Sequence, residues 1–170
     1  ILILFIILLE TCEDFTDIIF NLLINTDYNP ELIDTLFNTN TNKYIYKIIE
    51  FYIDKMQKVL TEKFSVQLSS RTPVLIKWTP GTEQKPHADK QLNDGSPNPF
   101  PDYDLNSLIY YNDNFEGGEL YYPEHDIVIK PEPGLAVAHP GDIHFLHGVK
   151  RIISGERWTT PSFYTVKEFI

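Results

Sequence analysis

Residues 116–142, with the sequence EGGELYYPEHDIVIKPEPGLAVAHPGD, decide the fold class of this chain. Three turn signals divide the stretch, at Glu116-Gly117-Gly118, Glu132-Pro133-Gly134 and Pro140-Gly141-Asp142. Three short apolar runs lie next to these turns, at 120–122, 127–129 and 135–137. Short apolar runs bounded by glycine and proline are typical of β-strands, so this part of the chain is predicted to be a series of short strands.

The same pattern continues on both sides of this stretch. Apolar and polar residues alternate in 64–68 and 74–78, and further strands are expected at 107–111, 144–149 and 157–166. Residues 90–103 are the exception, because Pro97, Pro99 and Pro101 exclude a central strand. A long loop of this kind beside a candidate site often acts as a lid.

The residues before the strands are predicted to be helical. A short apolar-rich helix is expected at 14–23, and Asn29-Pro30-Glu31 is a favourable helix start. The strongest signal is one apolar stripe at helical spacing, which we interpret as core packing. It consists of Ile45, Ile48, Ile49, Tyr52, Ile53, Met56 and Leu60. Helices followed by short strands about 8–12 residues apart indicate an α+β protein with a sandwich or barrel.

Length and composition exclude several classes of protein. The 170 residues are 42% hydrophobic and 22% charged, which rules out a disordered, collagen-like or coiled-coil chain. The net charge of −10 argues against nucleic acid or anionic lipid as a partner. A single cysteine, Cys12, excludes an internal disulfide.

The apolar run 1–9 is too short to span a bilayer, so a buried strand or helix start is expected there. A leftover signal peptide is the alternative. No targeting signal is readable, and we expect a cytoplasmic protein by default.

Three residues form a candidate metal site. His87 and Asp89 are two apart in a strand-like stretch, so their side chains point the same way, and His147 follows in a later strand. Two histidines and one carboxylate leave three positions open on an octahedral metal, which is the arrangement of non-haem Fe(II) oxygenases. A surface histidine beside a surface aspartate is the simpler reading of His87 and Asp89 taken alone.

Arg157 is a candidate anion site near this metal. An antiparallel hairpin would bring it back beside the strand of His147. A buried guanidinium needs an anionic partner, and a ligand carboxylate bound in bidentate fashion is a suitable one. His144 should point to the opposite face from His147, while His125 and His139 are expected in loops or on the outer face. Trp78 and Trp158 could stack on a substrate or pack in the core.

Residues 64–166 resemble the Fe(II)- and 2-oxoglutarate-dependent dioxygenase superfamily, and most closely its prolyl 4-hydroxylase-like branch. The motifs that carry the resemblance are Trp78-Thr-Pro-Gly81, His87-Ala-Asp89, Leu108-Ile-Tyr-Tyr-Asn-Asp113, Glu116-Gly-Gly-Glu119, Pro133-Gly134, His147-Gly-Val149 and Gly155-Glu-Arg157. The resemblance implies a double-stranded β-helix (jelly-roll) barrel buttressed by N-terminal helices. Residues 1–63 would be an N-terminal strand and supporting helices, and 64–170 the catalytic core, forming one structural unit.

The resemblance also implies roles for single residues. His87, Asp89 and His147 would bind Fe(II), and Arg157, with Tyr110 and Thr159, would bind 2-oxoglutarate. The branch often has lysine at the position of Arg157, and the family often has tryptophan at that of Phe163. Residues expected to contact substrate are Trp78, Tyr103, Tyr111 and Phe163. The cofactors implied are Fe(II), 2-oxoglutarate and O2, with ascorbate as a reductant.

The activity that this resemblance implies is hydroxylation of an unactivated C–H bond, with release of succinate and CO2. The carboxylate of Asp89 favours hydroxylation over halogenation, because related halogenases have a small residue there. Prolyl 4-hydroxylation of a peptide or protein is the expected reaction, with neither nucleic acid nor membrane as partner. Hydroxylation of a free amino acid or another side chain, a catalytically inactive metal-binding barrel, and a cupin-like metal protein are the alternatives.

Overall fold

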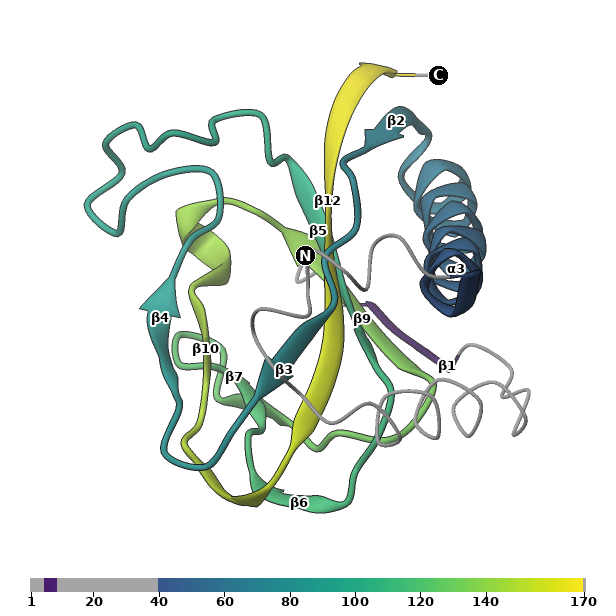
Figure 1. Cartoon of the computed structure of the whole chain (residues 1–170). Coiled ribbons are helices and arrows are strands. Elements are labelled where there is room, and N and C mark those ends of the chain that lie inside the picture. Colours follow the sequence, from purple (N-terminus) through teal and green to yellow (C-terminus); the bar gives the residue numbers. More distant parts are fainter. Residues whose placement is uncertain (1–4, 9–39, 170) are drawn as a thin grey trace.

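The computed structural model describes residues 5–8 and 40–169 and consists of antiparallel sheets and a long helix (Figure 1). The helix is α3 (Asn40–Phe64). The strands, in chain order, are β1 (Phe5–Leu8), β2 (Val66–Ser70), β3 (Ile76–Trp78), β4 (Gln84–His87), β5 (Leu105–Tyr110), β6 (Phe115–Gly117), β7 (Leu120–Tyr122), β8 (Ile127–Ile129), β9 (Leu135–Pro140), β10 (His147–Val149), β11 (Ile152–Gly155) and β12 (Arg157–Phe169). A 3-10 helix, η2 (Ile143–Phe145), precedes β10.

Two sheets form the body of the molecule. The larger has the order β1-β9-β5-β12-β2, with β3 also paired to β12, and the smaller has the order β4-β10-β7-β8. All of their strand pairs are antiparallel. β6 and β11 form a two-stranded ribbon. This arrangement confirms the predicted double-stranded β-helix, and the predicted first strand is present as β1.

Side chains from both sheets fill the space between them. Tyr110 on β5 and Val137 on β9 pack against Leu120 and Tyr122 on β7, and all four are almost completely buried. Because side chains on a strand alternate, the neighbours of these residues on β5 and β9 point to the opposite face of the larger sheet. The larger sheet is therefore buried on both sides.

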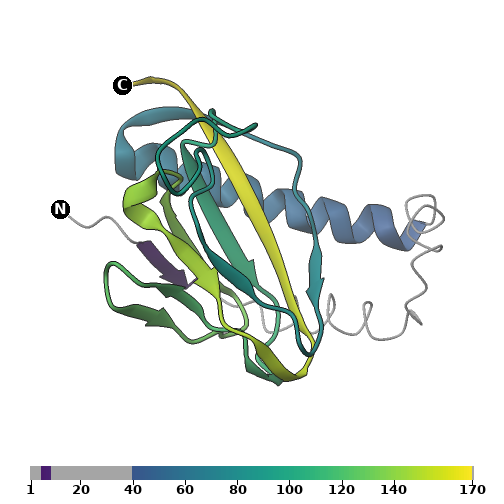
Figure 2. The ribbon, with the colours of Figure 1, turned by 90° about the vertical axis from the view of Figure 1, so that its left-hand side faces the viewer.

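Helix α3 covers the outer face of the larger sheet (Figures 1 and 2). Its buried residues Ile49, Ile53, Met56 and Leu60 belong to the predicted apolar stripe. They share a core cluster with Ile109, Ala138, Trp158 and Tyr164 of the sheet. The part of the stripe from Ile49 to Leu60 is thus core packing as predicted, and Trp158 is a core residue. The helices expected at 14–23 and after Asn29 lie outside the described residues, and within the described part of the chain no helix is long and apolar enough to cross a membrane.

The structure corrects two predictions around His147. Residues 144–149 are not one strand, because Asp142 caps η2 by accepting a hydrogen bond from the backbone N–H of His144. The strand begins only at His147. The expected hairpin between the strands of His147 and Arg157 is also absent, because β11 pairs with β6 and β12 pairs with β3, β5 and β2. Arg157 therefore belongs to the larger sheet, opposite the strand of His147.

Candidate metal and dicarboxylate site

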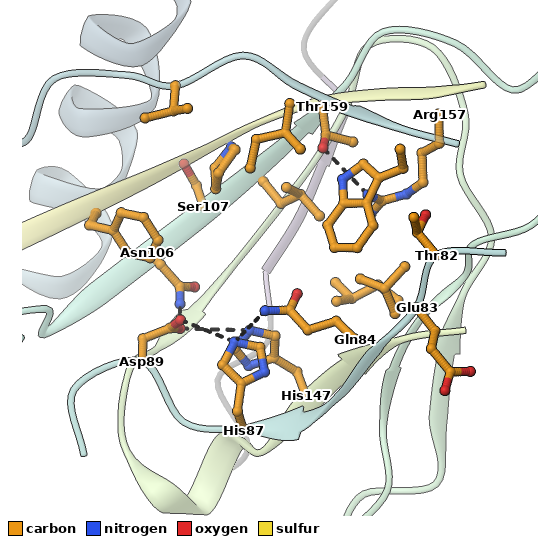
Figure 3. Close-up of a pocket in the computed structure, with 18 of the residues that line it drawn as sticks. Thr82, Glu83, Gln84, His87, Asp89, Asn106, Ser107, His147, Arg157 and Thr159 are labelled. Carbon is orange, nitrogen blue, oxygen red and sulfur yellow. Dashed lines mark hydrogen bonds and ion pairs between the residues drawn. The ribbon is translucent and has the colours of Figure 1, made fainter. Parts of the chain in front are cut away.

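A cavity of about 540 Å³ lies between the two sheets. Strands β4 and β10 of the smaller sheet supply His87 and His147 to its wall, and β5 and β12 of the larger sheet supply Asn106 and Arg157. Figure 3 shows His87, Asp89 and His147 gathered together, with Arg157 and Thr159 in another part of the cavity. The cavity thus has a cluster of possible metal ligands and a separate cationic part.

The ligand atoms of His87, Asp89 and His147 all lie within 4.8 Å of one another. His87 Nε2 is 3.7 Å from Asp89 Oδ1, and His147 Nε2 is 3.7 Å from Asp89 Oδ2. His87 Nδ1 donates to the carbonyl of Lys85 at 3.1 Å, and His147 Nδ1 donates to that of Phe145 at 3.0 Å. These bonds orient both rings, and in a neutral imidazole that donates through Nδ1 the Nε2 atom keeps the lone pair that binds a metal.

The pairing of β4 with β10 brings the two histidines together. His87 and His147 are directly opposite in this pair, and their ring centroids are 4.5 Å apart. Gly148 permits the close approach, because a Cβ at this position would lie 2.7 Å from the carbonyl oxygen of Gln84 and 2.8 Å from the Tyr121 ring. The glycine after His147 therefore sets the distance between the strands.

Replacing Gly148 by alanine should force β4 and β7 away from β10. Overpacking of this kind costs about 1–3 kcal/mol of stability. Because β4 carries His87, the change should also weaken metal binding. Urea unfolding and a metal titration of the variant test both effects, and wild-type values for both would show that the strands do not need this glycine.

Burial makes the cluster electrostatically unfavourable without a cation. It raises the pKa of Asp89 to about 7 and lowers the pKa of His147 well below its usual range. Burial also lowers the pKa of the neighbouring His139 to about 4, so this ring is neutral at pH 7. Two imidazoles and a desolvated carboxylate are a donor set suited to a divalent transition metal, whose charge would compensate the carboxylate. The residues present therefore fit Fe(II).

Arg157 is completely buried. Its guanidinium donates to Thr159 Oγ1 and to the Tyr110 hydroxyl, both at 3.4 Å, and lies over the rings of Trp78 and Tyr110. Burial lowers its pKa, but an arginine starts so high that the group stays charged. Within the described residues no carboxylate forms an ion pair with it, and its Nε and the indole Nε1 of Trp78 are buried without a hydrogen-bond partner.. Such an arrangement suits the carboxylate of a bound ligand.

The structure brings most of the predicted site residues to this cavity. His87, Asp89, His147, Arg157, Thr159, Trp78 and Phe163 line it. Tyr110 is not part of the cavity wall, but its hydroxyl accepts a hydrogen bond from Arg157. Tyr103 is also outside the wall and stacks on Phe163 with ring centroids 4.3 Å apart. Their roles stay predictions, but their positions suit those roles.

Tyr111 is placed elsewhere. It is 2% exposed, packs in the cluster beneath α3, and donates its hydroxyl hydrogen to Thr160 Oγ1 at 2.8 Å. It follows Tyr110 directly and so faces the other side of the larger sheet. The predicted contact of Tyr111 with substrate does not fit this position.

Three polar cavity residues were not among the predicted site residues. Asn106 donates to Asp89, Gln84 Nε2 lies 3.1 Å from His87 Nε2, and His139 lies edge-on to His147 with ring centroids 4.3 Å apart. The prediction that His139 lies in a loop or on the outer face was wrong, since it is 3% exposed on β9. Strand alternation could have found two of them: Asn106 shares a face with Tyr110, and His139 shares one with Val137.

Comparisons of sequence and of structure both find known proteins that are similar to this chain. No protein-family model matches the chain. Prolyl 3-hydroxylase 2 of Homo sapiens is 34% identical over 92 residues, which cover 47% of this chain and 13% of that protein. Prolyl 3-hydroxylase 1 of Gallus gallus is 31% identical over 68 residues, covering 37% and 9%. The chain thus matches only a small part of the length of these curated relatives.

Solved structures show the same fold over nearly the whole chain. The viral collagen prolyl hydroxylase of Paramecium bursaria Chlorella virus-1 has a TM-score of 0.66 at 18% identity, covering 95% of this chain and 94% of that one. A Pseudomonas putida prolyl-4-hydroxylase has a TM-score of 0.61 at 12% identity, covering 98% and 88%. An oxidoreductase of the 2OG-Fe(II) oxygenase family from Burkholderia pseudomallei has a TM-score of 0.53 at 17% identity, covering 82% and 57%. Over part of its length the chain is therefore similar in sequence to prolyl hydroxylases, and its fold is that of the solved prolyl hydroxylase and 2OG-Fe(II) oxygenase structures.

Proposed function

We propose that this chain is an Fe(II)- and 2-oxoglutarate-dependent dioxygenase that hydroxylates a prolyl residue of a peptide or protein. The observation that carries the proposal is the presence of both required sites in one cavity. Three metal-ligand atoms lie within 4.8 Å of one another, and the fully buried Arg157 lines the same space. The curated sequence relatives are named as prolyl hydroxylases, which supports proline as the substrate residue.

One group of residues would bind the metal, and a second group would bind the co-substrate. His87, Asp89 and His147 would hold Fe(II), and Arg157 would pair with the far carboxylate of 2-oxoglutarate, assisted by Tyr110 and Thr159. With iron, O2 and 2-oxoglutarate bound, the site would convert a C–H bond to C–OH while 2-oxoglutarate becomes succinate and CO2. Ascorbate would serve as the reductant that keeps the iron ferrous.

Aromatic side chains offer a surface for the proline ring. Trp78 and Phe163 line the cavity, and Tyr103 and Phe100 continue from Phe163 as a stack with centroid distances of 4.3 and 4.9 Å. A proline ring packs well on such faces because it is apolar and rigid. We assign Trp78, Phe163 and Tyr103 to substrate binding on this basis.

We propose carbon 4 of the proline ring as the position hydroxylated, following the motifs that resemble the prolyl 4-hydroxylase branch. A second candidate is carbon 3, because the curated sequence relatives are named prolyl 3-hydroxylases. The two reactions consume the same co-substrates, so only the product distinguishes them.

Incubation of the chain with Fe(II), 2-oxoglutarate, ascorbate and a panel of proline-rich peptides tests the proposal. We expect peptide-stimulated succinate release, matched by a peptide that gains the mass of one oxygen atom. Amino-acid analysis of the hydrolysed product then identifies 3- or 4-hydroxyproline. The His87→Ala variant should form neither product. Absence of peptide-stimulated succinate across the panel would contradict the peptide substrate, and free proline and other amino acids would then be tested as alternatives.

A further inference from the structure

The carboxylate of Asp89 is held by Asn106, a residue outside the predicted metal site. Asn106 Nδ2 donates a hydrogen bond to Asp89 Oδ2, as Figure 3 shows. This is the one hydrogen bond that the Asp89 carboxylate receives within the described residues. The backbone of Asp89 is fixed separately, because its N–H donates to Gly141 and its carbonyl accepts from Asn98.

Asn106 is a rigid support for this bond. It lies on β5, the central strand of the larger sheet, where it pairs with His139 of β9 on one side and Phe163 of β12 on the other. It is 4% exposed and lines the cavity. Its amide must present the N–H to the carboxylate, since two oxygens would repel one another. The position of the donor is therefore fixed by the sheet and by the chemistry of the pair.

The two histidines do not select between the oxygens of Asp89. Oδ1 lies 3.7 Å from His87 Nε2 and Oδ2 lies 3.7 Å from His147 Nε2. A carboxylate in this position can bind a metal through one oxygen or through both. The hydrogen bond from Asn106 falls on Oδ2 alone, so it occupies lone-pair directions of that oxygen and leaves Oδ1 for the metal.

We propose that Asn106 is a positioning residue that makes Asp89 bind the metal through a single oxygen. The inference rests on the proposed function, because that reaction needs three coordination positions of the metal to be left open by the protein. Two histidines and one oxygen take three of the six positions of an octahedral ion. Two more are needed for a bidentate keto acid, and the last is left for O2. Binding through both Asp89 oxygens would remove that last position.

Asn106→Leu tests the proposal, since leucine has a similar shape and no N–H donor. The readout is the number of exchangeable waters on bound Mn²⁺, measured by water-proton relaxation, together with the Mn²⁺ dissociation constant. We expect about three exchangeable waters in the wild-type chain and about two in the variant. The dissociation constant should rise about 10–100-fold, as for other partners of metal ligands. Asn106→Ser, whose hydroxyl lies one bond closer to the backbone, should behave in the same way and provides a second, smaller replacement.

Asn112→Leu is the matched control. Asn112 is also buried, at 5% exposure, and its amide bonds to Asn114 and to the backbone of Glu156 and Trp158, not to Asp89. The Asn112→Leu substitution should lower the melting temperature without changing the number of exchangeable waters on Mn²⁺ or the Mn²⁺ affinity. Unchanged water count and affinity in both Asn106 variants would overturn the role of Asn106 and leave the proposed enzyme intact. A wild-type chain that binds no metal would overturn both.

Discussion

Replacing Arg157 by alanine should raise the 2-oxoglutarate concentration needed for half-maximal succinate formation by about two to four orders of magnitude. Removing one partner of a buried charge pair costs about 3–5 kcal/mol, and each 1.4 kcal/mol is a factor of ten in affinity. Arg157 is fully buried, so solvent could not replace the proposed contact with the far carboxylate of 2-oxoglutarate. Its hydrogen-bond partners, Tyr110 and Thr159, are outside the metal cluster, so metal affinity should stay at the wild-type value.

Succinate release titrated against 2-oxoglutarate, with a parallel Mn²⁺ titration, separates the two effects. Arg157→Lys is the conservative control, because it keeps a cation at this position and should recover part of the affinity. 2-Oxoglutarate should also raise the melting temperature of the metal-loaded wild type far more than that of Arg157→Ala. An unchanged requirement for 2-oxoglutarate in the alanine variant would refute the assignment of Arg157.

Periodicity predicted the parts of the fold that depend on neighbouring residues. The stripe from Ile49 to Leu60 predicted the buried face of α3, because helical spacing fixes which side chains share a face. Turn signals predicted most strands for a similar local reason. Strand pairing is not local: β12 contacts β2, β3 and β5, which are far away in sequence, and the expected hairpin between β10 and β12 was therefore wrong.

In the site, too, the residues that could be predicted are those marked by a local sequence pattern. His87, Asp89 and His147 could be found because two-residue spacing and a motif mark them, and the structure places their ligand atoms together. Asn106 and His139 lack such a motif, and an interior side chain gives no sign in sequence of which cavity residue it touches. Asn106 contacts Asp89, and His139 contacts His147, because the two sheets pack face to face. That packing is a property of the three-dimensional structure and leaves no local pattern in the sequence.

Removing one metal ligand should abolish turnover. His87→Ala and Asp89→Asn each leave two strong ligands, and we expect succinate formation to fall below detection, because the site can no longer hold a metal with three protein ligands. The measurement is succinate release together with a metal titration followed by thermal unfolding. Divalent metal should raise the melting temperature of the wild type and have little effect on either variant. His144→Ala, which removes an exposed histidine three residues before His147, should retain wild-type values in both assays.

Comparing the melting temperatures of the metal-free wild type and the metal-free Asp89→Asn variant separates loss of metal binding from loss of stability. Burial raises the pKa of Asp89 to about 7, so above that pH the folded state contains a carboxylate that would be better solvated in the unfolded chain. Asp89→Asn removes this charge, and its metal-free form should melt no lower than the metal-free wild type at pH 8. A variant that is folded and at least as stable, yet neither binds metal nor forms succinate, would assign Asp89 to the metal rather than to the fold. Full turnover in Asp89→Asn would instead show that the carboxylate does not hold the iron, and the proposed site would be wrong.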